Sequence, residues 1–402
     1  MGGEKRQHAT FWLPGEESKF QGTIEKLEDR SISIVIVGSD EHRNSFSMFK
    51  RVYPVILGRS FDGQDFSLFD CFLRHSTSNH EGNFNIQLGA NLMIEGKHGN
   101  CKTDFDFSEA VFSFIGLEKW LNPLIADFIM DEGIAAEIKM PWPSEMKINC
   151  QDYDVSIRYH PRFSQGDYPS IEWNIFVAIT YHNNLKFEEL IKSIWHLKRF
   201  FEFAIKNNIL FTSVKAKCGQ EMLGLYFRND KVDPEALELS RHDMLLPYYK
   251  ISDQFGLVLN RWISLYTEKQ NFLSRYMKHL YQPDTYNEEL FFTAASLVEM
   301  YHNQFISDDR EKYIDHFVLI NSEFETLGQT LLNKAEIERI ENHRHYMAHG
   351  SQGRESNLLN STEMMIYINK IQIILCVLIL KQLGLEDIAR SAARSSGMIF
   401  FT

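Results

Sequence analysis

The sequence predicts an α+β protein in which a β-rich mixed domain is followed by an all-α helical bundle. Short runs of β-branched and aromatic residues dominate up to about residue 180. After about residue 246, long runs carry apolar residues at three- and four-residue spacing. The length of 402 residues also exceeds what one hydrophobic core usually organises. We therefore expect two domains, residues 1–245 and 246–402.

The N-terminal half reads as strands bounded by Gly, Asn, Asp or Pro. The strand-like runs are SISIVIVG, VYPVILGRSFDGQDFSLFDCF, NFNIQLGANLMIEG, YDVSIRYH and SIEWNIFVAITY. Asp-Gly within FDGQDF predicts a hairpin between two of them. A helical pattern follows at residues 185–207, where Leu190, Ile194, Leu197 and Phe201 recur on one face. The first domain is therefore expected to be mixed, with strands dominant.

The C-terminal half reads as a bundle of four or more helices joined by short polar segments. Helical periodicity is found in residues 255–281, 287–306, 316–349 and 358–384. The apolar run Ile373–Leu380 is half the length of a membrane span, so we expect a buried core helix. No apolar signal segment marks the N-terminus. These features predict a cytoplasmic protein that does not interact with membranes.

Composition limits the classes of function. The net charge of −12 argues against binding nucleic acid through bulk charge, so any such contact must be local. The five cysteines are odd in number and include no CxxC pair, which favours a reducing compartment over a disulfide framework.

One stretch carries the strongest chemical signal: ERIENHRHYMAHG, residues 338–350. Arg344 and His349 are five positions apart, a spacing that is not evidence by itself. Their position adds weight, because Gly350 predicts that the helix ends here, where side chains meet solvent. The site is therefore expected to be accessible.

The charge around this motif differs from that of its domain. Residues 339–354 contain three arginines and the single acid Glu341, whereas residues 246–402 contain 15 basic and 19 acidic residues. A histidine exchanges protons near neutral pH, and an arginine offers a charged fork matched to phosphate oxygens. The residues therefore favour metal-free cleavage of RNA, in which a base activates the 2′-hydroxyl and an acid protonates the leaving oxygen.

Helical geometry limits how Arg344 and His349 can form one site. At 100° per residue, Arg344 and His349 lie about 140° apart around a straight helix. Either the helix loosens before His349, or a second copy of the chain completes the site. The second option predicts a two-fold dimer in which motif faces motif.

RHYMAH, followed by Gly late in a helical bundle, resembles the ribonuclease motif of the HEPN family, which is Arg, a polar residue, and His after four to six positions. A β-rich domain with FWLPGEESKFQGTI and ILGRSFDGQDFSLFDCF ahead of the bundle resembles the ApeA group of anti-phage HEPN proteins. The resemblance implies a cytoplasmic, metal-independent endoribonuclease that needs no cofactor. It would stay dormant until a phage-encoded trigger is present, and then cut cellular RNA, with tRNA the expected substrate.

The resemblance also implies roles for residues. Arg344 would contact the phosphate, and His349 would be the main catalytic acid or base. His345 occupies the polar position, which is Asn in many members. SLVEMYHNQF resembles the earlier bundle helix that brings an acidic residue to the motif, so Glu299 and His302 are candidates for positioning the site, beside the alternative of a structural hydrogen-bonded pair.

Three alternatives remain open for the motif. It can be a polar helix end whose basic residues complement the helix dipole. It can belong to a non-catalytic module that dimerises through MMIYINKIQIILCVLIL and acts as a scaffold or antitoxin-like partner. A metal-dependent hydrolase would use Glu341, His345 and His349 at i, i+4 and i+8, although Tyr346 stands where H-E-x-x-H requires Glu.

Two residue sets in the first domain have structural interpretations. Cys71, His75, His80 and Cys101 match no standard zinc spacing and are interpreted as scattered strand and loop residues. Five tryptophans could stack RNA bases, but core packing is the favoured interpretation, because few basic residues interleave with them. They are Trp12, Trp120, Trp142, Trp173 and Trp195.

Overall fold

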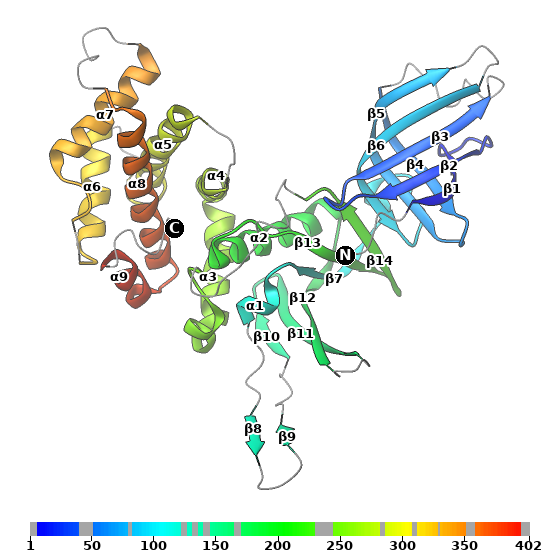
Figure 1. Ribbon diagram of the computed structural model, residues 1–402, viewed down its shortest axis with the longest axis horizontal. Helices are drawn as coiled ribbons and strands as arrows, with labels where there is room; N and C mark the ends of the chain where they lie inside the picture. The colour runs from blue at the N-terminus through cyan, green and yellow to red at the C-terminus, as the bar shows by residue number, and fades with distance from the viewer. Residues whose placement is uncertain are drawn as a thin grey trace. The chain divides into compact units, whose positions relative to one another are not determined.

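The predicted α+β fold class is confirmed: strands dominate the first part of the chain and helices the last (Figure 1). The computed structural model describes residues 6–39, 51–78, 83–121, 127–130, 136–139, 145–164, 170–229, 244–281, 286–307, 312–328, 330–350 and 358–394. Two compact units divide the chain. The first is Met1–Trp195 with Asn208–Leu239, and the second is His196–Asn207 with Ser240–Thr402.

A closed antiparallel barrel forms the first part of the first unit. Its strands are β1 Gln7–Trp12, β2 Phe20–Lys26, β3 Ile32–Ser39, β4 Val52–Ser60, β5 Asp65–Ser78 and β6 Asn83–Glu95. They follow the order β6-β3-β2-β1-β4-β5, and β5 pairs back with β6 to close the barrel. Alternate residues fill its interior with Phe, Ile, Leu and Met side chains. The predicted Asp-Gly hairpin is confirmed between β4 and β5, where Gly63 has φ 88°.

The barrel continues into a further set of antiparallel strands through β6, which pairs with β3 along its first part and with β14 along its last residues. The sheet runs β10-β11-β12-β7-β13-β14 before it reaches β6. The strands are β7 Phe107–Phe114, β10 Met146–Asn149, β11 Tyr153–Ser164, β12 Ser170–Leu185, β13 Phe211–Cys218 and β14 Glu221–Phe227. Strands β8 Asp127–Met130 and β9 Ala136–Lys139 pair separately, and α1 is Leu117–Leu121.

Helix α2, Phe187–Ile205, is shared between the two compact units. In its first half, Trp195 contacts the rings of Phe211 and Phe227 on β13 and β14, with centroids about 6 Å apart. Its second half, from His196, belongs to the helical unit. There Trp262 donates through Nε1 to the carbonyl oxygen of His196, 3.0 Å away. The helix predicted at residues 185–207 is therefore confirmed.

The tryptophans of the first domain divide by environment. Trp120 and Trp173 are buried as expected for core residues, and Trp195 is partly buried. Trp12 is only half-buried, on the outer surface of the barrel. Trp142 lies outside the described residues, as does His80 of the scattered Cys and His set.

The second unit is helical. Its helices are α3 Phe255–Glu268, α4 Gln270–Leu280, α5 Asn287–Phe305, α6 Tyr313–Glu325, α7 Lys334–His349, α8 Ser361–Gln382 and α9 Glu386–Arg394. Helix α8 packs against α5, α6 and α9. Every residue of Ile371–Leu380 is buried, which confirms the predicted core helix. Within the described residues, α8 alone is long and apolar enough to cross a membrane, but it lies mostly inside the unit.

A buried histidine makes the stability of the helical unit depend on pH. The amide of Gln372 on α8 lies 3.0 Å from Nε2 of His279 on α4, and donates to it when the ring is neutral. Burial lowers the pKa of His279 to about 4, from an ordinary value of 6.5. The stabilisation is therefore complete above about pH 6.5 and is lost as the pH falls from there towards 4.

We expect this residue to lower the free energy of unfolding by about 2 kcal/mol when the pH falls from 7.5 to 5. Denaturant titrations at both pH values measure the change. His279→Gln should reduce it, because glutamine does not titrate. His75→Gln, at an exposed histidine on β5, is the control and should leave the change as in the wild type. An equal pH dependence in His279→Gln and wild type would refute this role.

Candidate functional site

Helix α7 carries the RHYMAH motif and is regular throughout its length. It begins with a capping box, in which the side chain of Asn333 accepts from the backbone N–H of Glu336 and the Glu336 carboxylate accepts from the N–H of Asn333. It ends at Gly350, which has φ 59° and donates its N–H to the carbonyl of Tyr346, 2.7 Å away. The predicted helix end at Gly350 is confirmed. The helix does not loosen before His349.

The inner face of α7 anchors the motif to the bundle. Ile337, Ile340 and His343 are buried. His343 accepts through Nδ1 from the backbone N–H of Leu359, 3.1 Å away, and its ring meets the edge of Phe291 with centroids 5.0 Å apart. Burial lowers the pKa of His343, which keeps the accepting nitrogen unprotonated near neutral pH. His343 therefore ties the end of α7 to the chain that enters α8.

Arg344 is held by residues from two other helices. Its Nη2 donates to the carboxylate of Glu299 on α5, and its guanidinium carbon lies 4.3 Å from the ring centre of Tyr313 on α6. Tyr313 is fixed in turn, because its hydroxyl donates to the carbonyl of Ala295 across 3.0 Å. Burial raises the pKa of Tyr313, so it stays neutral. The guanidinium thus has a fixed orientation through an ion pair and a cation–π contact.

The Arg344 guanidinium is partly exposed and does not use all of its N–H donors in the ion pair with Glu299. The Arg344 side chain is 23% exposed and that of Glu299 is 39% exposed, so the pair lies at the surface. The Nε of Arg344 is buried and has no hydrogen-bond partner in the described part of the chain. An arginine has five N–H donors, and an anion that approaches this surface can use the terminal N–H groups that Glu299 leaves.

The two other motif histidines lie together on a separate face of α7. The rings of His345 and His349 have centroids 4.7 Å apart, as expected for residues four apart on a helix. His349 is exposed and His345 is partly exposed. Because the helix is regular, the offset of about 140° between Arg344 and His349 holds in this chain.

His302 lies deeper than the surface pair. It is fully buried one turn after Glu299 on α5, and its ring stacks on that of His316 on α6, with centroids 3.9 Å apart and an angle of 7° between the planes. This position is inaccessible to an RNA phosphate. Of the two predicted positioning residues, Glu299 contacts Arg344 directly, whereas His302 stands in the packed layer beneath.

Sequence reasoning did not single out Tyr313 or His316. The available signal was weak, because Tyr313 precedes the helical segment predicted from residue 316. In the structure both residues lie on one face of α6, three positions apart, as Glu299 and His302 do on α5. Only the packing of α5 against α6 shows that these two pairs form successive layers.

The metal-binding alternatives have a geometric test. Within the ranges given above, no group of three or more His, Cys, Asp or Glu side chains is arranged to hold a metal ion. Glu341, His345 and His349 share a helix without forming such a group. In the first unit, Cys71 is buried in the barrel and Cys101 is exposed.

Two family models match this chain, and together they span most of its length. Residues 7–262 match the family model described as ApeA N-terminal domain 1, and residues 248–388 match the model described as Apea-like HEPN. The chain belongs to the ApeA family. The resemblance seen in the motif and domain order is therefore confirmed. No curated protein and no solved structure matches this chain.

The HEPN match of this ApeA protein runs from before α3 to the start of α9. It includes the Arg344–Glu299–Tyr313 contact and the histidines of α7. The two family matches point to a ribonuclease-type function in defence against phage.

Proposed function

We propose that this ApeA protein is a metal-independent endoribonuclease that cuts cellular RNA, with tRNA the expected substrate, and thereby stops growth during phage infection. The observation that carries the proposal is the oriented, partly exposed Arg344 on the same HEPN-domain helix as His345 and the exposed His349. The first unit restrains this activity or detects a phage-encoded trigger. The protein acts in the cytoplasm without a cofactor.

Each residue of the proposed site has a role that its surroundings support. Arg344 binds the scissile phosphate and stabilises the charge that develops on it. His349 is exposed and exchanges a proton with the 2′-hydroxyl or the leaving oxygen. His345, in ring contact with His349, orients it. Glu299 holds the Arg344 guanidinium in place before RNA binds. When RNA binds, N–H groups of the guanidinium donate to the phosphate.

The angular offset on α7 supports a site shared by two copies of the chain. A straight helix cannot aim Arg344 and His349 at one phosphate. A two-fold axis beside α7 brings His349 of one copy opposite Arg344 of the other. Cleavage by attack of the 2′-hydroxyl then leaves a 2′,3′-cyclic phosphate.

An exposed apolar surface is available for such a dimer at the same end of the bundle. Tyr286, Met365 and Ile366 are exposed, at the beginnings of α5 and α8. A hydrogen bond from Asn287 to Ser361 joins these two helix starts. The contact between Leu359 and His343 places the start of α8 beside the motif. The interface proposed for a homodimer or larger oligomer is therefore adjacent to the catalytic helix.

The alternative proposal is a non-catalytic module that dimerises through the apolar segment of α8. The burial of Ile371–Leu380 removes most of that segment from any interface and leaves only the first turns of the helix. Growth after induction distinguishes the proposals. Arg344→Ala should relieve toxicity if the protein is a nuclease, and should have no effect if it is a scaffold.

Metal independence has its own test. The purified protein, activated by phage lysate if dormant, should cleave RNA at an unchanged rate in excess EDTA and leave 2′,3′-cyclic phosphate ends. The expectation follows from the chemistry of Arg344 and His349, which supplies charge stabilisation and proton transfer without an ion. Loss of cleavage in EDTA, restored by a divalent cation, would favour the hydrolase with Glu341, His345 and His349.

The ion pair at Arg344 supports a further prediction. Glu299→Gln should lower the rate of cleavage by about tenfold, because a neutral amide holds the guanidinium less firmly in position. Stability should change by less than about 1 kcal/mol, since the pair is partly exposed. Glu323→Gln removes a comparable ion pair between α6 and α8 and is the matched control. Equal activity of Glu299→Gln and Glu323→Gln would contradict the positioning role.

A further inference from the structure

A pocket of about 510 Å³ lies on the outer surface of the barrel, in the first unit, and none of the proposed ribonuclease residues lines it. Its lining includes Thr10 and Trp12 of β1, Gln21 of β2 and Arg59 of β4, together with Lys19 and His98. Thr10 is paired in the sheet with both Gln21 and Arg59, so these three side chains form a row across adjacent strands. The volume is in the range of small-ligand sites.

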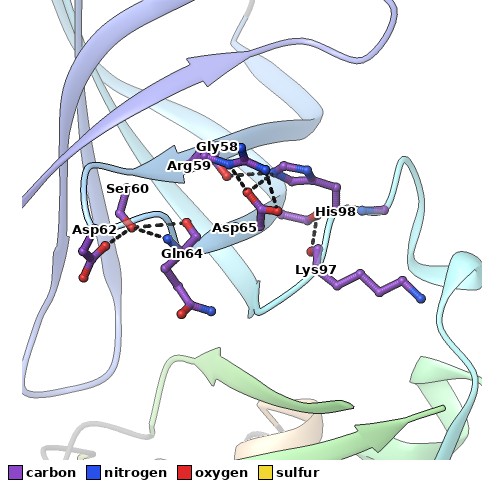
Figure 2. A network of polar contacts seen from close by, with 10 residues as sticks. Gly58, Arg59, Ser60, Asp62, Gln64, Asp65, Lys97 and His98 are labelled. Atoms are coloured by element: carbon purple, nitrogen blue, oxygen red, sulfur yellow. Dashed lines mark hydrogen bonds and ion pairs between the residues drawn. The ribbon is translucent and has the colours of Figure 1, made fainter. Parts of the chain in front are cut away.

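Arg59 and His98 of this pocket are fixed by a polar network (Figure 2). Arg59 donates to both carboxylate oxygens of Asp65, from Nε across 2.5 Å and from Nη2 across 2.9 Å. This pairing lowers the pKa of Asp65, which stays ionised. His98 donates through Nε2 to the carbonyl of Gly58, 2.9 Å away, and the same nitrogen lies 3.5 Å from Asp65. Arg59 and His98 are therefore held in place, and Nη1 of Arg59 bonds to no other residue that the structure describes.

An aromatic face and an unpaired lysine complete the pocket. The ring of Trp12 is half-buried and meets the edge of His98 with centroids 5.1 Å apart. Lys19 is exposed, and its Nζ lies 5.2 Å from the ring centre of Trp12. In the described part of the chain, Lys19 has no acidic partner. A ligand that carries both a negative charge and a planar ring could therefore pair its charge with Lys19 and place its ring against Trp12.

The side chains that line this pocket include two cations, Lys19 and Arg59, and no carboxylate. Asp65 and Asp62 bond to Arg59 and Ser60 of the lining but do not themselves line the pocket. The pocket therefore presents positive charge in a protein whose total charge is −12. A phosphate monoester, at about −1.5 to −2 near pH 7, complements this charge.

We propose that this pocket binds a mononucleotide, with its base against Trp12 and its phosphate between Lys19 and Arg59. A guanidinium already oriented by Asp65 offers its remaining N–H groups to phosphate oxygens. An indole face stacks on any nucleobase. A simple carboxylate or inorganic phosphate would use the cations and leave Trp12 unused. This inference goes beyond the proposed nuclease activity and does not depend on it.

Isothermal titration of the full chain with adenosine 5′-monophosphate tests the proposal, with adenosine and inorganic phosphate as comparison probes. We expect one saturable site per chain for the nucleotide, and binding at least about tenfold weaker for either probe alone. Lys19→Gln and Trp12→Leu should each weaken nucleotide binding by about tenfold. Lys19 is exposed and donates no hydrogen bond to another described residue, so its replacement leaves the fold intact.

The barrel provides matched controls outside the pocket. The guanidinium of Arg74 lies 5.6 Å from the ring centre of Phe72 on β5, a cation–aromatic pair of the same kind. Arg74→Gln and Phe72→Leu should bind the nucleotide as the wild type does. The proposal is overturned if the wild type shows no saturable binding, or if Lys19→Gln and Trp12→Leu bind normally. It is also overturned if inorganic phosphate binds as tightly as the nucleotide.

Discussion

Replacing His349 by alanine is expected to reduce RNA cleavage by at least about a hundredfold, the usual contribution of a general acid or base. His349 is exposed at the last turn of α7, where an imidazole can reach a substrate. Its removal creates no buried cavity. The fold should therefore be unchanged, and the loss should be confined to the chemical step.

Cleavage of labelled RNA by the purified variant, compared with the wild type at equal concentration, measures this effect. RNA ends sequenced during phage infection provide the cellular counterpart. His75→Ala, at an exposed histidine on β5, controls for loss of a surface imidazole. His345→Ala should cost less than His349→Ala, because His345 acts through its neighbour. If His349→Ala cuts RNA as fast as the wild type, the catalytic assignment is wrong.

Two inactive variants should restore one another's activity when mixed. Arg344→Ala and His349→Ala chains, combined in equal amounts under conditions that allow subunit exchange, form mixed dimers in about half of all pairs. Each mixed dimer has one site with both residues intact if the two residues come from different copies. We therefore expect about a quarter of wild-type activity, whereas each variant alone stays near zero.

The control for this experiment is the double variant Arg344→Ala with His349→Ala, mixed with the wild type. It supplies no missing residue, and equal mixing should leave at most about half of the activity. If a single chain holds the whole site, the two single variants mixed together remain inactive. If the two variants carry different affinity tags, purification through one tag recovers the other variant when exchange has occurred, so an inactive mixture counts against the shared site.

Features set by neighbouring residues could be predicted from the sequence. Gly350 marks the helix end because only its backbone adopts the positive φ without strain, and Asp-Gly does the same for the β4–β5 hairpin. The apolar stretch of α8 is buried because the removal of apolar side chains from water is favourable. These signals act within a few residues and depend little on the rest of the fold.

Features set by contacts between distant segments could not be predicted. Tyr313 lies under Arg344 only because α6 packs beside α7, and no residue spacing encodes that contact. His302 shares a helix face with Glu299, yet its depth depends on how α5 meets α6. Helices α3 and α4 divide at Lys269, where neither Gly nor Pro signals a break. Closure of the barrel by β5 and β6 is likewise a non-local pairing.

Barrel closure also has a consequence for solubility. A strand at the border of a sheet exposes unpaired backbone groups that can recruit another chain into an aggregate. In the main sheet of the described chain, β5 is paired on both sides, and β10 is left at the border. It has only four residues and carries an exposed lysine, Lys147. A short charged border is a poor template for self-association, which suits the proposed role of a protein that stays folded and inactive until infection.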